Sequence, residues 1–262
     1  MNILDKIIIS KRNEVNLRKR LFSVDFLEKS SFFERKTYSL ADNLIKKSPG
    51  IIAEFKRKSP SANSLNELAD VKEVINGYVD SGAAALSILT DHKFFGGNLS
   101  DLAAARNQSN YPVLRKDFII DEYQVIEAKA SGADAVLLIA EILTENQIRN
   151  FSRLARSLSM EVILEIHQKE QLVKLSDLVT IVGVNNRNLK NLQIEVNSSF
   201  KLAALIPSQF LSISESGISS PDTIRKLMDS GYKGFLIGEY FMRHEKPAEA
   251  CKMLIKKVLK KN

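Results

Sequence analysis

Polar and charged residues follow directly after most of the short apolar segments of this chain. The first such segment, residues 51–53, leads directly into Glu54 and Lys56. Residues two apart on a β-strand point to the same face, so these two side chains are expected next to each other. A charge at the edge of a core must be paired, because an unpaired buried charge is strongly destabilising. The two residues are therefore interpreted either as a structural ion pair or as part of a reactive site.

Similar residues follow most of the other apolar segments. They are Thr90 and Asp91, residues 115–117, Glu165, residues 185–187, Glu215 with Ser216 and Gly217, and Gly238 with Glu239. Each of them alone can be a helix cap or a surface charge. If they meet at one place they must shift one another's pKa values, which is typical of a catalytic site.

The elements that would position these residues can be read from hydrophobic periodicity. Eight segments rich in Ile, Val, Leu and Ala predict strands that are covered on both faces, as in a parallel sheet. They span 51–55, 84–89, 112–115, 135–139, 161–165, 180–184, 210–214 and 234–237. Between them, apolar residues recur at helical spacing over 70–82, 121–132, 144–159 and 220–231. Asp70, Asp121, Thr144 and Ser220 are the expected start signals.

The spacing of these units predicts an α/β fold, a (β/α)₈ TIM barrel. Gly82, Gly132 and Gly231 each follow a predicted helix, and their separations fit repeats of about 25 residues, one strand plus one helix. A doubly wound sheet is the competing fold, but it usually carries a glycine-rich turn after the first strand, where this chain reads KRKSPSANS. In a barrel, the carboxyl ends of all strands meet at one mouth, where active sites lie.

The whole chain, residues 1–262, is interpreted as a single domain. Residues 1–48 precede the first strand and predict an N-terminal helical extension of one or two helices packed on the barrel. That extension could close the bottom of the barrel or cover its rim.

Composition narrows the function classes. The net charge of +7 comes largely from residues 11–20 and 256–261, which are interpreted as solvated helix faces. No nucleic-acid module is recognisable, and no apolar run approaches the roughly 20 residues that cross a membrane. The single cysteine, Cys251, cannot form an internal disulfide, which indicates a cytoplasmic protein. A small anionic molecule remains the expected partner.

Two glycine-bearing turns predict a phosphate site. Ser216-Gly217 and Gly238-Glu239 follow the last two strands and precede helices. Backbone N–H groups at helix starts bind anions, and barrels often place phosphate at these two loops. Ordinary tight turns are the alternative. The carboxylate of Glu239 would repel a phosphate, so it is expected to point away.

Taken together, these motifs resemble the indole-3-glycerol-phosphate synthase family of tryptophan biosynthesis. The resemblance covers nearly the whole chain and is carried by AEFKRKSPS (53–61), FFGG (94–97), LRKDFIID (114–121), GADAVLLIA (132–140), ILEIH (163–167), VGVNNRNL (182–189), SESGI (214–218) and FLIGE (235–239). It implies a carboxy-lyase that closes the ring of 1-(2-carboxyphenylamino)-1-deoxyribulose 5-phosphate with loss of CO₂ and water. It also implies a monomer without cofactor or metal.

The resemblance assigns roles to individual residues. Lys116 is implied as the acid, with a pKa lowered by neighbouring cations. Lys56 would meet the substrate carboxylate, Glu165 is the first candidate for the base, and Glu54 is the second. Substrate contacts are implied for Asn185, Arg187, Glu215, Phe95, Phe118, Leu137, Leu189 and Ile218, although Leu137 can equally be core. Phosphate contacts are implied for Ser59, Ser216, Gly217, Gly238 and Glu239.

Other readings are less consistent with the residues. The three histidines form no ligand-spaced cluster, and His167 is interpreted as structural and facing away from Glu165. The sister isomerase of the pathway uses a cysteine at the end of the first strand, where this chain has Glu54 to Lys56. Tryptophan synthase α subunit would not need the set of Lys56, Lys116 and Glu165. A non-catalytic phosphate-binding barrel would be free to lose Lys116 or Glu165, and both are present.

Overall fold

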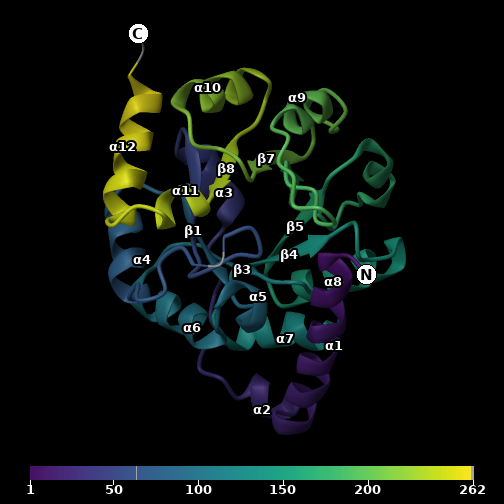
Figure 1. Ribbon diagram of the computed structural model, residues 1–262. Helices are drawn as coiled ribbons and strands as arrows, with labels where there is room; N and C mark the ends of the chain where they lie inside the picture. The colour runs from purple at the N-terminus through teal and green to yellow at the C-terminus, as the bar shows by residue number, and fades with distance from the viewer. Residues whose placement is uncertain (63, 261–262) are drawn as a thin grey trace.

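A computed structural model describes residues 1–62 and 64–260. Eight parallel strands close into a barrel in the order β1 to β8, with β8 pairing back to β1, and helices surround them (Figure 1). The strands are β1 (Gly50–Phe55), β2 (Ala85–Leu89), β3 (Val113–Lys116), β4 (Ala135–Ile139), β5 (Glu161–Ile166), β6 (Ile181–Asn185), β7 (Leu211–Glu215) and β8 (Gly234–Ile237). The predicted strands and the predicted TIM barrel are confirmed, with bounds that differ by at most one residue.

The outer helices follow the strands. They are α4 (Val71–Asp80), α5 (His92–Phe95), α6 (Leu99–Gln108), α7 (Glu122–Ala130), α8 (Glu145–Ser157), the 3₁₀ helix η1 (Lys169–Lys174), α9 (Asn197–Ala203), α10 (Pro221–Asp229), α11 (Glu239–Met242) and α12 (Pro247–Leu259). Asp70, Asp121 and Thr144 cap their helices through side-chain oxygens, as predicted, whereas Ser220 makes no side-chain cap bond. No helix in the described ranges is both long and apolar enough to span a bilayer.

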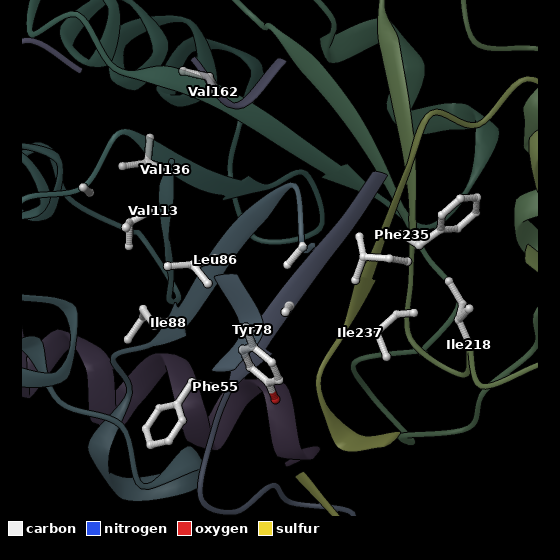
Figure 2. Close-up of a cluster of buried hydrophobic side chains, with 14 of the residues drawn as sticks. Phe55, Tyr78, Leu86, Ile88, Val113, Val136, Val162, Ile218, Phe235 and Ile237 are labelled. Carbon is white, nitrogen blue, oxygen red and sulfur yellow. The ribbon is translucent and has the colours of Figure 1, made fainter. Parts of the chain in front are cut away.

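Alternation along the strands divides the core into two layers. Leu86, Ile88 and Val136 point outward and pack beneath the helices, where Tyr78 of α4 joins them (Figure 2). Leu137 and the other inward residues fill the barrel itself. Both faces of each strand are therefore covered, which explains why the strands read as continuous apolar runs in the sequence.

The extension forms three helices, not the one or two predicted: α1 (Ile3–Leu21), α2 (Val24–Glu28) and α3 (Leu40–Lys46). It lies at both ends of the barrel. At the amino end, the Glu161 carboxylate accepts from the backbone N–H groups of Leu40 and Ala41, both at 2.9 Å. At the carboxyl end, Leu4 and Ile7 of α1 line the mouth. The extension thus closes the bottom and also covers the rim.

Lys11 of α1 is fully buried, so the prediction that the basic residues of 11–20 lie on a solvated face is wrong for it. Its Nζ lies 2.9 Å from Asp117 Oδ1 and 3.0 Å from Asp91 Oδ2. The physical reason is helical spacing: Lys11 is four residues from both Ile7 and Val15, on the face that α1 buries. The two carboxylates make its burial tolerable.

Candidate active site

A cavity of about 320 Å³ opens at the carboxyl ends of the strands. Every strand, or the residue next to it, contributes to the lining. The contributors are Glu54, Leu89, Lys116, Ile139, Glu165, Asn185, Glu215 and Ile237. Side chains separated by as much as 183 positions in the sequence therefore meet at one mouth, because parallel strands of a closed barrel all end there.

Lys116 lies among carboxylates in this cavity. Its Nζ is 3.2 Å from Glu165 Oε2 and 3.8 Å from Glu215 Oε2. Burial alone would lower the pKa of Lys116, but Glu165, Glu215 and Glu54 outweigh burial and raise it. The prediction of a pKa lowered by cations is wrong.

The reason lies in the direction of the neighbouring side chain. Arg115 precedes Lys116 on β3, and successive strand residues point to opposite faces. The Arg115 guanidinium therefore lies in the outer layer, 3.1 Å from Asp117 and 2.9 Å from Glu127. Lys116 meets acids inside the barrel instead.

The pKa values of Glu165 and Glu215 are shifted in opposite directions although both residues are buried. Burial favours the neutral form of Glu165, but the charges of Lys116 and His167 outweigh burial and lower its pKa. For Glu215, burial and then the nearby Glu165 raise the pKa well above its usual range. Oε1 of each glutamate has no hydrogen-bond partner among the described residues. A lysine and two carboxyl groups whose pKa values are shifted in opposite directions thus face one cavity, which is suited to proton transfer.

His167 does not face away from Glu165 as the sequence analysis expected. Its Nε2 lies 3.4 Å from Glu165 Oε1. The two residues are two positions apart at the end of β5, so strand alternation places them on the same face, and the expectation misapplied that rule.

Glu54 and Lys56 form a close ion pair, with Lys56 Nζ 2.7 Å from Glu54 Oε1. Gly238, at the end of the neighbouring strand β8, leaves room for the Glu54 carboxylate. A Cβ at position 238 would lie 2.3 Å from Glu54 Oε1, so any larger residue there would displace the carboxylate. Both charged side chains line the cavity.

The predicted phosphate-contacting residues lie on one wall of the cavity. Ser216 and Gly217 have φ values of 67° and 73°, and Gly238 caps α11. Two successive residues in the left-handed region form a tight turn that glycine favours. Ser59 closes the wall from the loop after β1, where its N–H donates to the Ala62 carbonyl.

The Glu239 carboxylate is neutralised by two arginines. Oε2 accepts from Arg187 at 2.9 Å and Oε1 accepts from Arg243 at 2.7 Å. Burial would raise the pKa of Glu239, but Arg243, Lys56 and Arg187 outweigh burial and lower it. Both arginines line the cavity, so the carboxylate is paired within the site instead of pointing away from it.

Most of the predicted apolar wall lines the cavity. Phe95 and Phe118 lie with ring centroids 6.0 Å apart, and Leu189 and Ile218 join them. Leu137 is the exception, because it is fully buried inside the barrel and does not line the cavity. Barrel interiors fill in layers, and Leu137 belongs to a layer below the mouth.

Several lining residues were missed in the sequence. They are Leu4, Ile7, Leu89, Ile139, Leu192, Ile194, Tyr240 and Arg243. Ile139 had a usable signal, since it lies two positions after Leu137 on the same face of β4. Leu192 and Ile194 lie in the irregular segment after β6 and had none. Among residues 1–62 and 64–260, no three His, Cys, Asp or Glu are placed to hold a metal ion.

Comparison with known proteins identifies the family. The family model described as indole-3-glycerol phosphate synthase matches residues 4–254. An indole-3-glycerol phosphate synthase of Bacteroides thetaiotaomicron is 43% identical over 257 residues, which cover 98% of this chain and 99% of that relative. The Acinetobacter baumannii enzyme of the same name is 38% identical, with 95% and 93% covered.

Solved structures show the same fold. A tryptophan synthase α-subunit from Pyrococcus furiosus superposes with a TM-score of 0.60 at 15% identity, covering 81% of this chain and 98% of that one. Identity this low is evidence for the fold alone. The family follows from the full-length relatives and from the family model: the chain belongs to the indole-3-glycerol phosphate synthase family.

Proposed function

We propose that the mouth cavity carries out the reaction of this family, with Lys116 as the acid and Glu165 as the base. In that reaction a ring carbon of the substrate attacks its ketone carbon, and CO₂ and then water are lost. The observation that carries the proposal is the contact between Lys116 Nζ and Glu165 Oε2, 3.2 Å apart in the wall of the cavity.

Lys116 acts in the ring-closing step. Attack on the ketone turns its oxygen into an alkoxide, which an adjacent ammonium stabilises electrostatically. The raised pKa of Lys116 keeps the group charged before the substrate reacts. Proton transfer to the alkoxide then remains favourable, because an alkoxide is a much stronger base than an amine.

Glu165 acts in the dehydration step. Its lowered pKa keeps it ionised and able to remove the C–H proton while the hydroxyl leaves as water. The proton can return to Lys116 across the same contact. Glu54 is the second candidate for the base. Lys56, which is paired with Glu54, would hold the substrate carboxylate and keep the reacting carbons close.

The remaining walls bind the substrate. Asn185, Arg187 and Glu215 are proposed to orient the hydroxyls and the anthranilate end. Phe95, Phe118, Leu189 and Ile218 would enclose the aromatic ring. Ser59, Ser216, Gly217, Gly238 and Glu239 would hold the phosphate, chiefly through backbone N–H groups and hydroxyls. The loop of residues 56–64, in which residue 63 lies outside the described residues, is proposed from its sequence to move over the bound substrate.

The proposal also covers assembly and location. A single-domain monomer in the cytoplasm fits a closed barrel, which has no free strand edge, and an extension that packs on both ends of it. Light scattering of the purified protein would test the monomer, and fractionation of expressing cells would test the location.

The acid–base pair is tested with the substrate itself. The purified protein should produce indole fluorescence from the carboxyphenylamino sugar phosphate. Lys116→Met should reduce turnover by about 10³-fold, with an unchanged circular dichroism spectrum. Lys201→Met, at an exposed position of α9, is the matched control and should keep the wild-type rate. Wild-type turnover in Lys116→Met would overturn the role given to Lys116.

A further inference from the structure

The reaction consumes one proton in each turnover. The substrate carboxylate leaves as neutral CO₂ and the hydroxyl leaves as neutral water, so the negative charge that is lost must be balanced by a proton from solution. In the proposed scheme Lys116 donates twice, to the ketone oxygen and to the leaving hydroxyl. Glu165 recovers only one proton, from the C–H bond. A second proton must reach this pair while the substrate fills the mouth of the barrel.

A second cavity lies beside the first and provides a source. It measures about 540 Å³, and polar side chains such as Glu141, Gln193 and Glu195 line it. Asn185 and Leu189 line both cavities and form part of the wall between them. Water in this side cavity would remain in place when the substrate occupies the catalytic one.

His167 connects the two cavities. Its side chain lines the second cavity, and its Nε2 lies 3.4 Å from Glu165 Oε1. Among the described residues, neither ring nitrogen has a hydrogen-bond partner, and neither does Oε1 of Glu165. Buried polar atoms are rarely left unpaired, so an exchangeable proton or a water accounts for this contact better than a fixed structural bond does.

We propose that His167 relays protons from the side cavity to Glu165, an inference that rests on the roles proposed above for Lys116 and Glu165. The unprotonated nitrogen of the neutral ring takes a proton from water in the side cavity, and the hydroxide that is left is neutralised by bulk solvent. The ring then turns about its Cβ–Cγ bond. The Nε2–H bond then breaks as an O–H bond forms at Glu165 Oε1. Rotation about the Cγ–Cδ bond of Glu165 brings that proton to the neutral Lys116 amine, which becomes an ammonium again, and Glu165 becomes a carboxylate again.

The charges around His167 suit this task. Glu165 lies beside it on β5. Glu141 from the segment after β4 and Lys190 and Glu195 from the segment after β6 line the same side cavity. Glu141 is neutralised by Lys190, 2.5 Å away, and Glu195 by Lys201, 2.9 Å away. Glu165 is therefore the carboxylate with which the imidazolium exchanges its proton. The His167 backbone N–H donates to Gln171 Oε1 at 2.6 Å, which fixes the position of the residue without engaging the ring.

The test separates proton relay from simple positioning. His167→Gln keeps a polar side chain that cannot carry a proton, and His167→Ala leaves room for imidazole from solution. Both variants should lower kcat by at least about tenfold with little change in KM, less than the 10²–10⁴-fold typical of a group that acts on substrate directly. Added imidazole should restore kcat in His167→Ala and have no effect on His167→Gln. Gln193 lines the side cavity but not the catalytic one, so Gln193→Ala should behave as wild type.

Two results would overturn the relay. One is a wild-type kcat in His167→Gln. The other is a loss in His167→Ala that imidazole does not restore while thermal unfolding shows an intact fold, since this would mark His167 as a positioning residue only. Failure of the acid–base assignment would appear separately, as retained turnover in Lys116→Met.

Discussion

Lys11 and Lys116 are both buried among carboxylates, but the two sets of carboxylates differ in whether all of their oxygens are paired. Lys11 is bound by Asp91, Asp117 and Glu14, and Asp117 also accepts from the Thr90 hydroxyl at 2.5 Å. Lys116 has Glu165 and Glu215 beside it, and each of these has an oxygen without a partner in the described structure. Among the described residues, every buried carboxylate oxygen around Lys11 has a partner, so this group is called the closed cluster, although Asp117 also lines the cavity. The Lys116 group leaves oxygens unpaired at that cavity.

The contrast shows what distinguishes a reactive cluster from a structural one. In both cases carboxylates outweigh burial and raise the pKa of the lysine, so a shifted pKa does not separate them. Unpaired oxygens at a cavity do separate them, because a substrate can complete the bonding there. The Lys11 cluster instead joins α1 to the ends of β2 and β3 and holds Leu4 and Ile7 over the mouth.

The largest expected change in stability comes from removing the lysine of the closed cluster. Lys11→Met should lower the free energy of unfolding by about 3–5 kcal/mol, because it leaves buried carboxylates without their cation. Lys116→Met should cost less than about 2 kcal/mol, since water in the cavity can solvate the carboxylates left behind. Urea denaturation of both variants measures the difference. Equal losses would mean that the two clusters are energetically alike.

The next prediction compares the same Glu→Gln change at two positions, one beside Lys116 and one beside the closed cluster. Glu165→Gln should lower kcat by about 10²-fold or more and leave stability nearly unchanged. Glu127→Gln weakens the 2.9 Å contact to Arg115, which itself pairs with Asp117 of the closed cluster, and should lower the free energy of unfolding by about 1.5–3 kcal/mol. The folded Glu127→Gln protein should keep its turnover. A catalytic loss in Glu127→Gln with little loss of stability would contradict this division.

A pH series tests the closed cluster alone. Burial opposes ionisation of Asp117, but Lys11 and Arg115 outweigh burial and lower its pKa. Its contribution to stability is therefore complete above the unfolded value of about 3.9 and is lost as the pH falls below it. The gap in melting temperature between wild type and Lys11→Met should narrow from pH 7 to pH 3. A gap that stays constant over this range would show that Asp117 does not depend on Lys11.

The two lysines also differ in how much of their surroundings could be predicted from the sequence. Apolar runs and strand-end residues were enough for the barrel, and the geometry of a parallel barrel then brought Lys116 and Glu165 to one mouth. The charges nearest to Lys116 could not be read, because Glu165 and Glu215 lie 49 and 99 positions away and only the packing of the closed barrel sets their distances from it. Two of the partners of Lys11, Asp91 and Asp117, come from segments 80 and 106 positions away, and no local pattern indicates them.

The smallest expected change in stability comes from neutralising one carboxyl group, and it should have opposite signs in the two clusters. Burial and Glu165 raise the pKa of Glu215, so the folded protein holds this group protonated at pH values where the unfolded chain has it ionised. The folded state binds more protons, and stability falls as the pH rises above the unfolded value of about 4.3. Glutamine is permanently neutral, so Glu215→Gln should be more stable than wild type by about 1 kcal/mol at pH 7.5.

That gain should shrink at pH 4, where the wild-type group is largely protonated in the unfolded state as well as in the folded state. Asp117→Asn, which neutralises a carboxylate of the closed cluster, should instead be less stable than wild type at pH 7.5. Thermal unfolding of both variants at the two pH values decides the point. Destabilisation of Glu215→Gln at pH 7.5 would mean that the Lys116 cluster is optimised for the fold, and that its unpaired oxygens do not mark a site where stability is given up for catalysis.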